Sequence, residues 1–152
     1  MPPTYVSVIG GSTCTAEGAA GVMGAVARGV RRRGGTCIGI LPTLERRDAA
    51  PDLSFSLLTG MGHARNLAVV ASGDVVIALG GSWGTLSEIG LARSIGREVV
   101  LLESWAVTPA RGELEGLHRA ADPTEGELSG LHRAANPTEA VELALSLAAA
   151  RG

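Results

Sequence analysis

The stretch that most constrains the fold runs from Val75 to Glu88 and reads VVIALGGSWGTLSE. A short apolar run typical of a buried strand leads into a Gly-rich turn, and Thr85–Glu88 then open a helical pattern. Where a strand ends in glycines and leads into a helix, the amides of the turn and the positive end of the helix dipole converge on one point. The stretch therefore predicts an anion-binding site, with the carboxylate of Glu88 about one helical turn away.

Strand and helix patterns alternate along the rest of the chain. Residues 43–59 have no clear period and predict a loop. Strands that are apolar on both faces and alternate with helices indicate a Rossmann-like, doubly wound parallel sheet of three α/β/α layers. The length predicts a single domain over residues 1–152. The further predicted strands are Tyr5–Ile9, Thr36–Leu41 and Glu98–Leu102, and the predicted helices are Ala16–Arg33, His63–Ser72 and Thr85–Ile95.

A second strand-to-glycine junction follows the first predicted strand, at Gly10-Gly11-Ser12. Ligands of doubly wound sheets bind beyond the carboxyl ends of the strands, so we expect both glycine junctions at the same sheet edge. The glycines at positions 10, 11, 81 and 84 also have a plainer explanation, as turn residues that need a positive φ. Two such turns on one edge favour phosphate binding.

The C-terminal part contains a tandem duplication over residues 112–139. Gly112–Glu125 and Gly126–Glu139 are blocks of the same length that differ at only two positions. A doublet is too short for a solenoid, and the first copy is expected to be a surface insertion. The second copy leads into a predicted helix over Pro137–Ala150, with Asn136 as its N-cap and the proline at its first position.

Composition excludes several classes of function. The net charge of -2 gives no support for nucleic-acid binding. All 13 basic residues are arginine, which removes Lys-based Schiff-base and Walker-type mechanisms. His, Asp and Cys show no metal-ligand spacing, and Cys14 and Cys37 are expected to be buried thiols. No apolar run is long enough to span a membrane and the first residues do not resemble a signal peptide, so a soluble cytoplasmic protein is expected.

Five segments, in order, resemble the LOG-type or "lysine decarboxylase-like" superfamily. Gly81–Glu88 is similar to its GGxGTxxE signature. The details favour the short bacterial branch, to which the molybdenum-cofactor carrier protein also belongs; the other branch holds cytokinin-activating phosphoribohydrolases. The remaining matches are Ile9–Ser12 at the end of the first strand, Gly21–Val26 at a helix start, Gly39–Pro42 in the next strand, and Gly60–Asn66 in an Arg-bearing segment.

The resemblance implies a phosphorylated ligand, a nucleotide or a molybdenum-cofactor-like pterin, with no other cofactor required, and a homodimer or higher homo-oligomer. The resemblance also allows an enzymatic function, because the phosphoribohydrolases belong to the same superfamily. These enzymes cleave the N-glycosidic bond of nucleoside 5′-monophosphates to free base and ribose 5-phosphate. The catalytic pair carried over by motif is Arg65 and Glu88. The ligand-binding residues implied are Gly10, Gly11, Ser12, Gly21, Asn66, Gly81, Ser82, Gly84 and Thr85.

The chain departs from the family pattern in two places. Only a few residues around Cys14–Gly18 stand where the family has a helix and a strand, so one β-α unit is expected to be missing. Thr36–Leu41 would then pair directly with Tyr5–Ile9 in a right-handed crossover. The second departure is Ser82, which replaces a glycine of the phosphoribohydrolases and whose hydroxyl can add a donor.

Each candidate residue also has a purely structural explanation. Glu88 can simply complement the helix dipole, Arg65 can be a solvated helix residue, and Asn66 an ordinary cap. His63 is expected to lie at the surface rather than act as a base, and no role is assigned to the duplicated His118 and His132. Trp83 can stack on a ligand ring or simply cover the turn. A ligand carrier, a phosphoribohydrolase and a degenerate relative without a ligand all stay open at this point.

Overall fold

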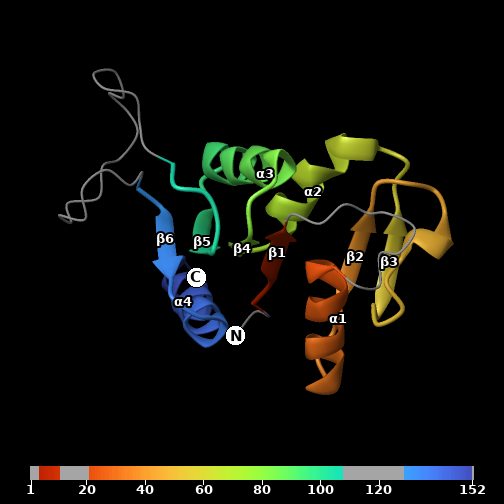
Figure 1. Cartoon of the computed structure of the whole chain (residues 1–152), viewed down its shortest axis with the longest axis horizontal. Coiled ribbons are helices and arrows are strands. Elements are labelled where there is room, and N and C mark those ends of the chain that lie inside the picture. Colours follow the sequence, from red (N-terminus) through yellow and green to blue (C-terminus); the bar gives the residue numbers. More distant parts are fainter. Residues whose placement is uncertain (1–3, 11–20, 108–128, 152) are drawn as a thin grey trace.

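The computed structural model describes residues 4–10, 21–107 and 129–151 (Figure 1). Strands and helices alternate along most of this chain, as the sequence predicts. The strands are β1 (Val6–Gly10), β2 (Ile38–Leu41), β3 (Phe55–Leu58), β4 (Val75–Leu79), β5 (Glu98–Leu102) and β6 (Leu131–Ala134). The helices are α1 (Val22–Arg32), α2 (Arg65–Ser72), α3 (Trp83–Ser94) and α4 (Pro137–Arg151), with short 3-10 turns η1 (Arg46–Asp48) and η2 (Gly62–Ala64).

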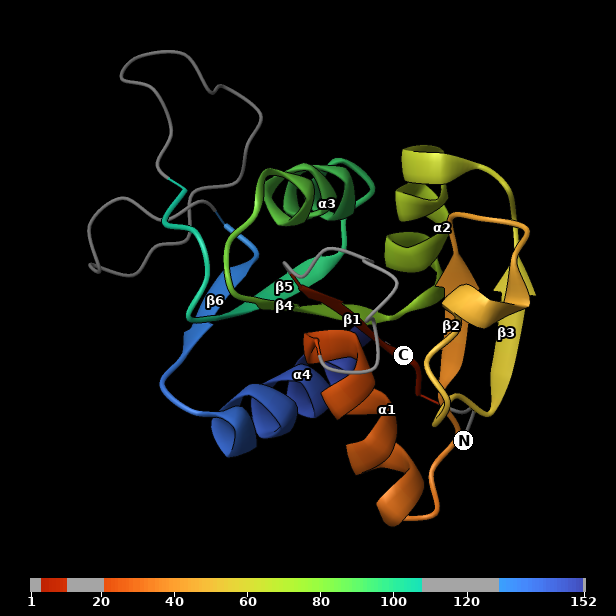
Figure 2. The same ribbon diagram turned by 45° about the vertical axis from the view of Figure 1, so that its right-hand side comes forward.

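The main sheet has four parallel strands in the order β1-β4-β5-β6. Figure 2 shows α2 and α3 on one face of this sheet and α1 and α4 on the other. The predicted Rossmann-like α/β/α fold is therefore confirmed. Parallel strands need crossover connections, and helices from both faces cover the sheet because its strands are apolar on both sides.

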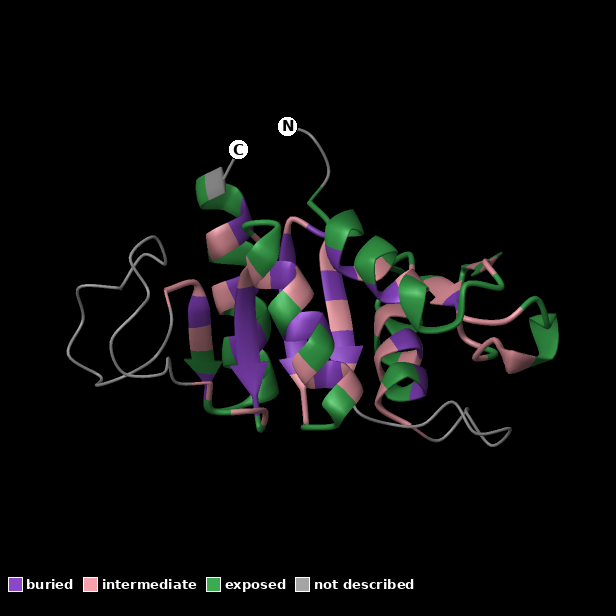
Figure 3. Cartoon of the chain, turned by 90° about the horizontal axis from the view of Figure 1, so that it is seen from above, coloured by how far each residue is buried: buried purple, intermediate pink, exposed green. Residues whose placement is uncertain are grey.

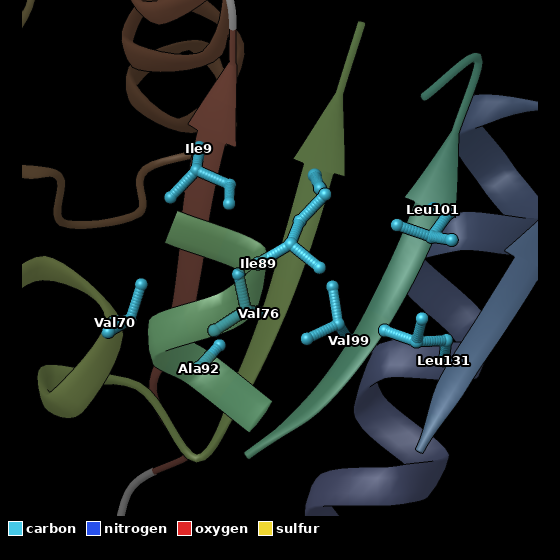
Figure 4. Close-up of a cluster of buried hydrophobic side chains, with 9 residues drawn as sticks. Ile9, Val70, Val76, Ile89, Ala92, Val99, Leu101 and Leu131 are labelled. Carbon is cyan, nitrogen blue, oxygen red and sulfur yellow. The ribbon is translucent and has the colours of Figure 1, made fainter. Parts of the chain in front are cut away.

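Two hydrophobic clusters, one on each face of the main sheet, form the core. Alternate residues of β4 point to opposite faces, so Val76 packs under α2 and α3 while Val75 packs against α4. Figure 3 shows buried residues concentrated in the strands and exposed ones on the outer sides of the helices. The cluster drawn in Figure 4 comprises Ile9, Val70, Val76, Ala78, Ile89, Ala92, Val99, Leu101 and Leu131.

The predicted pairing of the first and second strands is wrong. β2 pairs in parallel with β3 in a separate two-stranded sheet, and β1 pairs with β4. β4 is apolar throughout and longer than β2, which makes it the better central neighbour for β1. The predicted loop over 43–59 is also wrong in part, because it contains η1 and β3. β3 gave little signal because it has only four residues and its apolar Phe55 and Leu57 are exposed.

The second copy of the duplication forms a strand that the sequence did not predict. β6 reads LHRA, with two polar residues between apolar ends, which is a weak strand pattern for an edge position. His132, to which no role was assigned, lies with Nε2 2.7 Å from Oε2 of Glu98 on the neighbouring strand. The predicted cap of α4 is confirmed, because Oδ1 of Asn136 accepts the amide of Glu139 at 3.0 Å. The first copy lies outside the described residues.

Two other features of the described chain bear on the sequence-based expectations. No helix in the described ranges combines the length and the apolar character that a membrane span requires. Cys37 is a partly buried free thiol whose burial raises its pKa, whereas Cys14 lies outside the described residues.

Candidate ligand site at the carboxyl edge of the sheet

The strand ends that precede the two glycine junctions lie side by side at one edge of the main sheet. In the register of the sheet Gly10 at the end of β1 is opposite Leu79 at the end of β4. Helix α1, which follows β1 in the sequence, lies on one face of the sheet, and α3, which follows β4, lies on the other (Figure 2). This reversal is the topological switch point at which ligands bind in open α/β sheets. Of the first junction only Gly10 can be placed, because Gly11 and Ser12 lie outside the described residues.

Gly10 is required by close packing rather than by backbone conformation. A Cβ atom at this position would lie 3.0 Å from Cγ1 of Val22 and 3.1 Å from the carbonyl oxygen of Leu79. Gly21, the N-cap residue of α1, has an extended backbone with φ of -84°. Glycine at position 10 therefore lets the start of α1 come close to the strand end.

In the second junction, the glycine with a positive φ is Gly80, not Gly81 or Gly84 as the sequence suggested. Gly80 has φ of 67°, and its amide donates to the carbonyl oxygen of Leu102 at 3.2 Å. Gly81 must be small, because a Cβ there would lie 3.3 Å from Nε1 of Trp105. Gly84 lies in the first turn of α3, where a Cβ would meet only the Ser82 hydroxyl at 3.6 Å.

Ser82 is the N-cap of α3, which therefore begins two residues earlier than predicted. Its Oγ accepts the amide of Thr85 at 3.2 Å and lies 3.1 Å from the Thr85 hydroxyl. Thr85 is 1% exposed. Ser82 therefore acts mainly as an acceptor that fixes the helix start. The amides of Trp83 and Gly84 have no acceptor within the helix, and with the dipole they form the anion-attracting end of α3.

Arg65 and Glu88, the pair that the resemblance carried over, lie close enough to interact electrostatically. Glu88 is 8% exposed on α3. Burial raises the pKa of the Glu88 carboxyl, and the positive charge of Arg65 on α2 partly lowers it. The ion pairs of the described residues do not include a direct bridge between the two. Nε of Arg65 is buried without a hydrogen-bond partner.

Asn66 follows Arg65 and is also buried, at 7% exposure. It is not the cap that the sequence allowed, because the N-cap residue of α2 is Ala64. No side-chain hydrogen bond of Asn66 is found in the described part of the chain. Buried polar side chains normally have a hydrogen-bond partner, so the Asn66 side chain has unused hydrogen-bonding capacity.

Sequence reasoning missed the residues that follow β5. Nε1 of Trp105 donates to the carbonyl oxygen of Ser82 at 3.0 Å, and its ring centroid lies 5.2 Å from that of Trp83. Oγ of Ser104 is buried without a hydrogen-bond partner. Among the described residues, Glu103 is the non-glycine residue with a positive φ, at 49°. The signal that could have found these residues is their position, directly after a parallel strand at the ligand-binding edge.

Other predicted features of the site can now be placed. His63 is exposed in η2, as expected. Within residues 4–10, 21–107 and 129–151, His, Cys, Asp and Glu form no cluster that could hold a metal ion. The groups described at this edge are amides, hydroxyls, a guanidinium, a carboxamide and the carboxyl groups of Glu88 and Glu103. Apart from the carboxyl groups, this set is suited to a phosphorylated organic ligand.

The family follows from a match that covers most of the chain, over residues 4–141. This protein belongs to the SLOG cluster4 family. It is also 41% identical over 87 residues to an uncharacterised protein of Archaeoglobus fulgidus. That match covers 57% of this chain and 56% of the relative, so it spans about half the length of each. The predicted LOG-like superfamily is thus confirmed.

Solved structures show the same fold along almost the whole chain. The molybdenum cofactor carrier protein of Chlamydomonas reinhardtii is 23% identical, with a TM-score of 0.72 over 96% of this chain and 98% of its own. The molybdenum cofactor binding protein of Rippkaea orientalis is 22% identical, with a TM-score of 0.68 over 97% and 98%. The structure of TM1055 is 28% identical, with a TM-score of 0.69 over 95% and 99%. These likenesses show that the fold is that of the carrier proteins.

Proposed function

We propose that this protein binds a phosphorylated small molecule at the carboxyl edge of its main sheet, with the phosphate at the N-terminus of α3. The observation that carries the proposal is the start of α3 at the switch point, beside the end of β1. The amides of Trp83 and Gly84 are available to an anion there, and Gly10 keeps the neighbouring strand end free of a side chain.

The groups on α2 supply the second part of the proposed site. The guanidinium of Arg65 can bind phosphate oxygens through two parallel hydrogen bonds, and its Nε is buried without a hydrogen-bond partner. The buried carboxamide of Asn66 can donate to the same ligand or accept from a ring or sugar group. Cationic and neutral donors from two helices would then surround the ligand on the α2 and α3 side.

The ligand class we propose is a nucleotide or a molybdenum-cofactor-like pterin, carried rather than consumed. Two of the similar structures are a molybdenum cofactor carrier and a molybdenum cofactor binding protein, and their likeness to this chain extends over nearly its full length. The turn and helix start that would take a phosphate suit either cargo, because both carry a phosphate on an organic ring system.

A phosphoribohydrolase is the second candidate, and the environment of Glu88 favours it. A buried carboxyl with a raised pKa beside an arginine is a common arrangement for acid–base work. In that reaction Glu88 would orient the attacking water and stabilise positive charge on the ribose, while Arg65 would hold the 5′-phosphate. Water adds to C1′ of the ribose and loses one proton, and the base leaves with the electrons of the N-glycosidic bond and takes up a proton.

Calorimetric titration with AMP and with ribose 5-phosphate tests the binding proposal. We expect saturable binding of both, weakened at least tenfold in Arg65→Ala and little changed in His63→Ala, whose target is exposed. Chromatography of the same mixtures tests catalysis. Free adenine that is released by the wild type and lost in Glu88→Gln would make the protein an enzyme. Binding without release would support the carrier, and the absence of any binding would contradict both functions.

A further inference from the structure

We propose that Trp83 and Trp105 form a platform on which the planar ring of the ligand stacks. This inference rests on the proposed phosphate site and narrows its ligand to phosphorylated compounds with a fused heteroaromatic ring, such as a purine or a pterin. Trp83 is 78% exposed, more than any other large apolar residue of the described chain. Trp83 is the first residue of α3, at the carboxyl edge of the main sheet. An indole this exposed at such a position is typical of a side chain that binds a partner or a ligand.

Trp105 holds Trp83 in place. The two rings pack with centroids 5.2 Å apart and planes tilted by 37°, which is within the range of favourable aromatic pairs. Nε1 of Trp105 donates to the carbonyl oxygen of Ser82, the cap of α3, at 3.0 Å. Trp105 also packs against the hydrophobic core. The anchored inner ring therefore restrains the outer one, and most of the Trp83 surface stays accessible to a ligand.

The platform and the phosphate site share a residue. Trp83 is the first residue of α3, so its backbone amide belongs to the anion-attracting helix end while its side chain carries the outer ring. A ligand that places its phosphate on these amides has its remaining atoms beside the indole. Stacking on an aromatic face accepts any planar base, so the platform favours ring-bearing phosphates over plain sugar phosphates without selecting one base.

Tryptophan fluorescence tests the stacking platform directly, because Trp83 and Trp105 are the two tryptophans of the chain. We expect AMP to quench the emission saturably and ribose 5-phosphate to bind, by calorimetry, with much less quenching. In Trp83→Ala the affinity for AMP should fall about tenfold, while the affinity for ribose 5-phosphate stays within about twofold. Trp83→Phe should recover most of the loss. Phe55→Ala removes an exposed aromatic from the separate sheet and should leave both affinities unchanged.

Several results would overturn the stacking platform. One is an unchanged AMP affinity in Trp83→Ala, and another is an equal loss for AMP and ribose 5-phosphate, which would mean that Trp83 only shapes the turn. A change of sedimentation coefficient in Trp83→Ala would assign the indole to a protein contact instead. If the wild type binds neither compound, the phosphate site itself is wrong, which is a different failure from that of the platform.

Discussion

The substitution Gly80→Ala isolates the backbone geometry that shapes the α3 turn. Gly80 has φ of 67°, and a Cβ built there meets no atom within 4 Å. The cost is therefore conformational strain alone, about 1–2 kcal/mol for an L-residue in the left-handed region. For a domain of this size, about 2–4 °C of melting temperature corresponds to each kcal/mol, so we expect Gly80→Ala to melt about 2–8 °C below the wild type.

Gly90→Ala provides a matched control ten residues away. Gly90 lies exposed within α3, and a Cβ there also meets nothing within 4 Å. Alanine is favoured over glycine in a helix by about 0.5–1 kcal/mol, so this variant should be more stable than the wild type. Gly80→Asn should cost less than Gly80→Ala, because asparagine tolerates the left-handed region better. Urea and thermal melts followed by circular dichroism measure all three. Equal stability of Gly80→Ala and Gly90→Ala would refute the turn geometry.

Three further predictions concern pH, the duplication and assembly. Burial raises the pKa of Glu88 in the folded protein, so its contribution to stability is full below the ordinary value of 4.5 and is lost as pH rises through the folded pKa. Glu88→Gln should therefore gain stability relative to the wild type as pH rises from 4 to 8; a constant difference between the two proteins over this range would contradict this. Deleting either 112–125 or 126–139 leaves nearly the same chain, since the blocks differ only at Glu115/Ser129 and Asp122/Asn136. Because Asp and Asn cap helices about equally well, both deletions should fold and melt within about 2 °C of each other; a fold lost in only one would refute this. Sedimentation should give twice the 15.4 kDa chain mass, and a monomer at all concentrations would exclude the homodimer.

The sequence predicted the main sheet well where the hydrophobic signal was strong. β4 is apolar throughout and β5 is apolar after its first residue, Glu98; both were found, β5 with its observed bounds. β3 and β6 were missed because four-residue strands with exposed or polar positions have no distinct period. Strand pairing could not be derived, and the pairing predicted for β1 was wrong, since pairing depends on how distant elements pack rather than on any local pattern.

Some features of the candidate site were likewise predicted from the sequence, and others were not. Local pattern located Gly10 and placed the start of α3 within two residues, and family resemblance paired Arg65 with Glu88 on two different helices. The sequence did not show which glycine has a positive φ, because glycine at positions 80, 81 and 84 is compatible with several backbone conformations of the turn. Trp105 was missed because its contact with Ser82 joins residues that are distant in the chain. Such contacts exist only once the sheet edge is assembled.

Amide chemical shifts in ¹⁵N-labelled protein, followed during titration with AMP, test the central claim most directly. We expect saturable changes in chemical shift that are largest at the amides of Trp83 and Gly84, with a parallel change at Nε of Arg65 and none along α4. Saturable binding that leaves the amides at the start of α3 unmoved would contradict a phosphate site there.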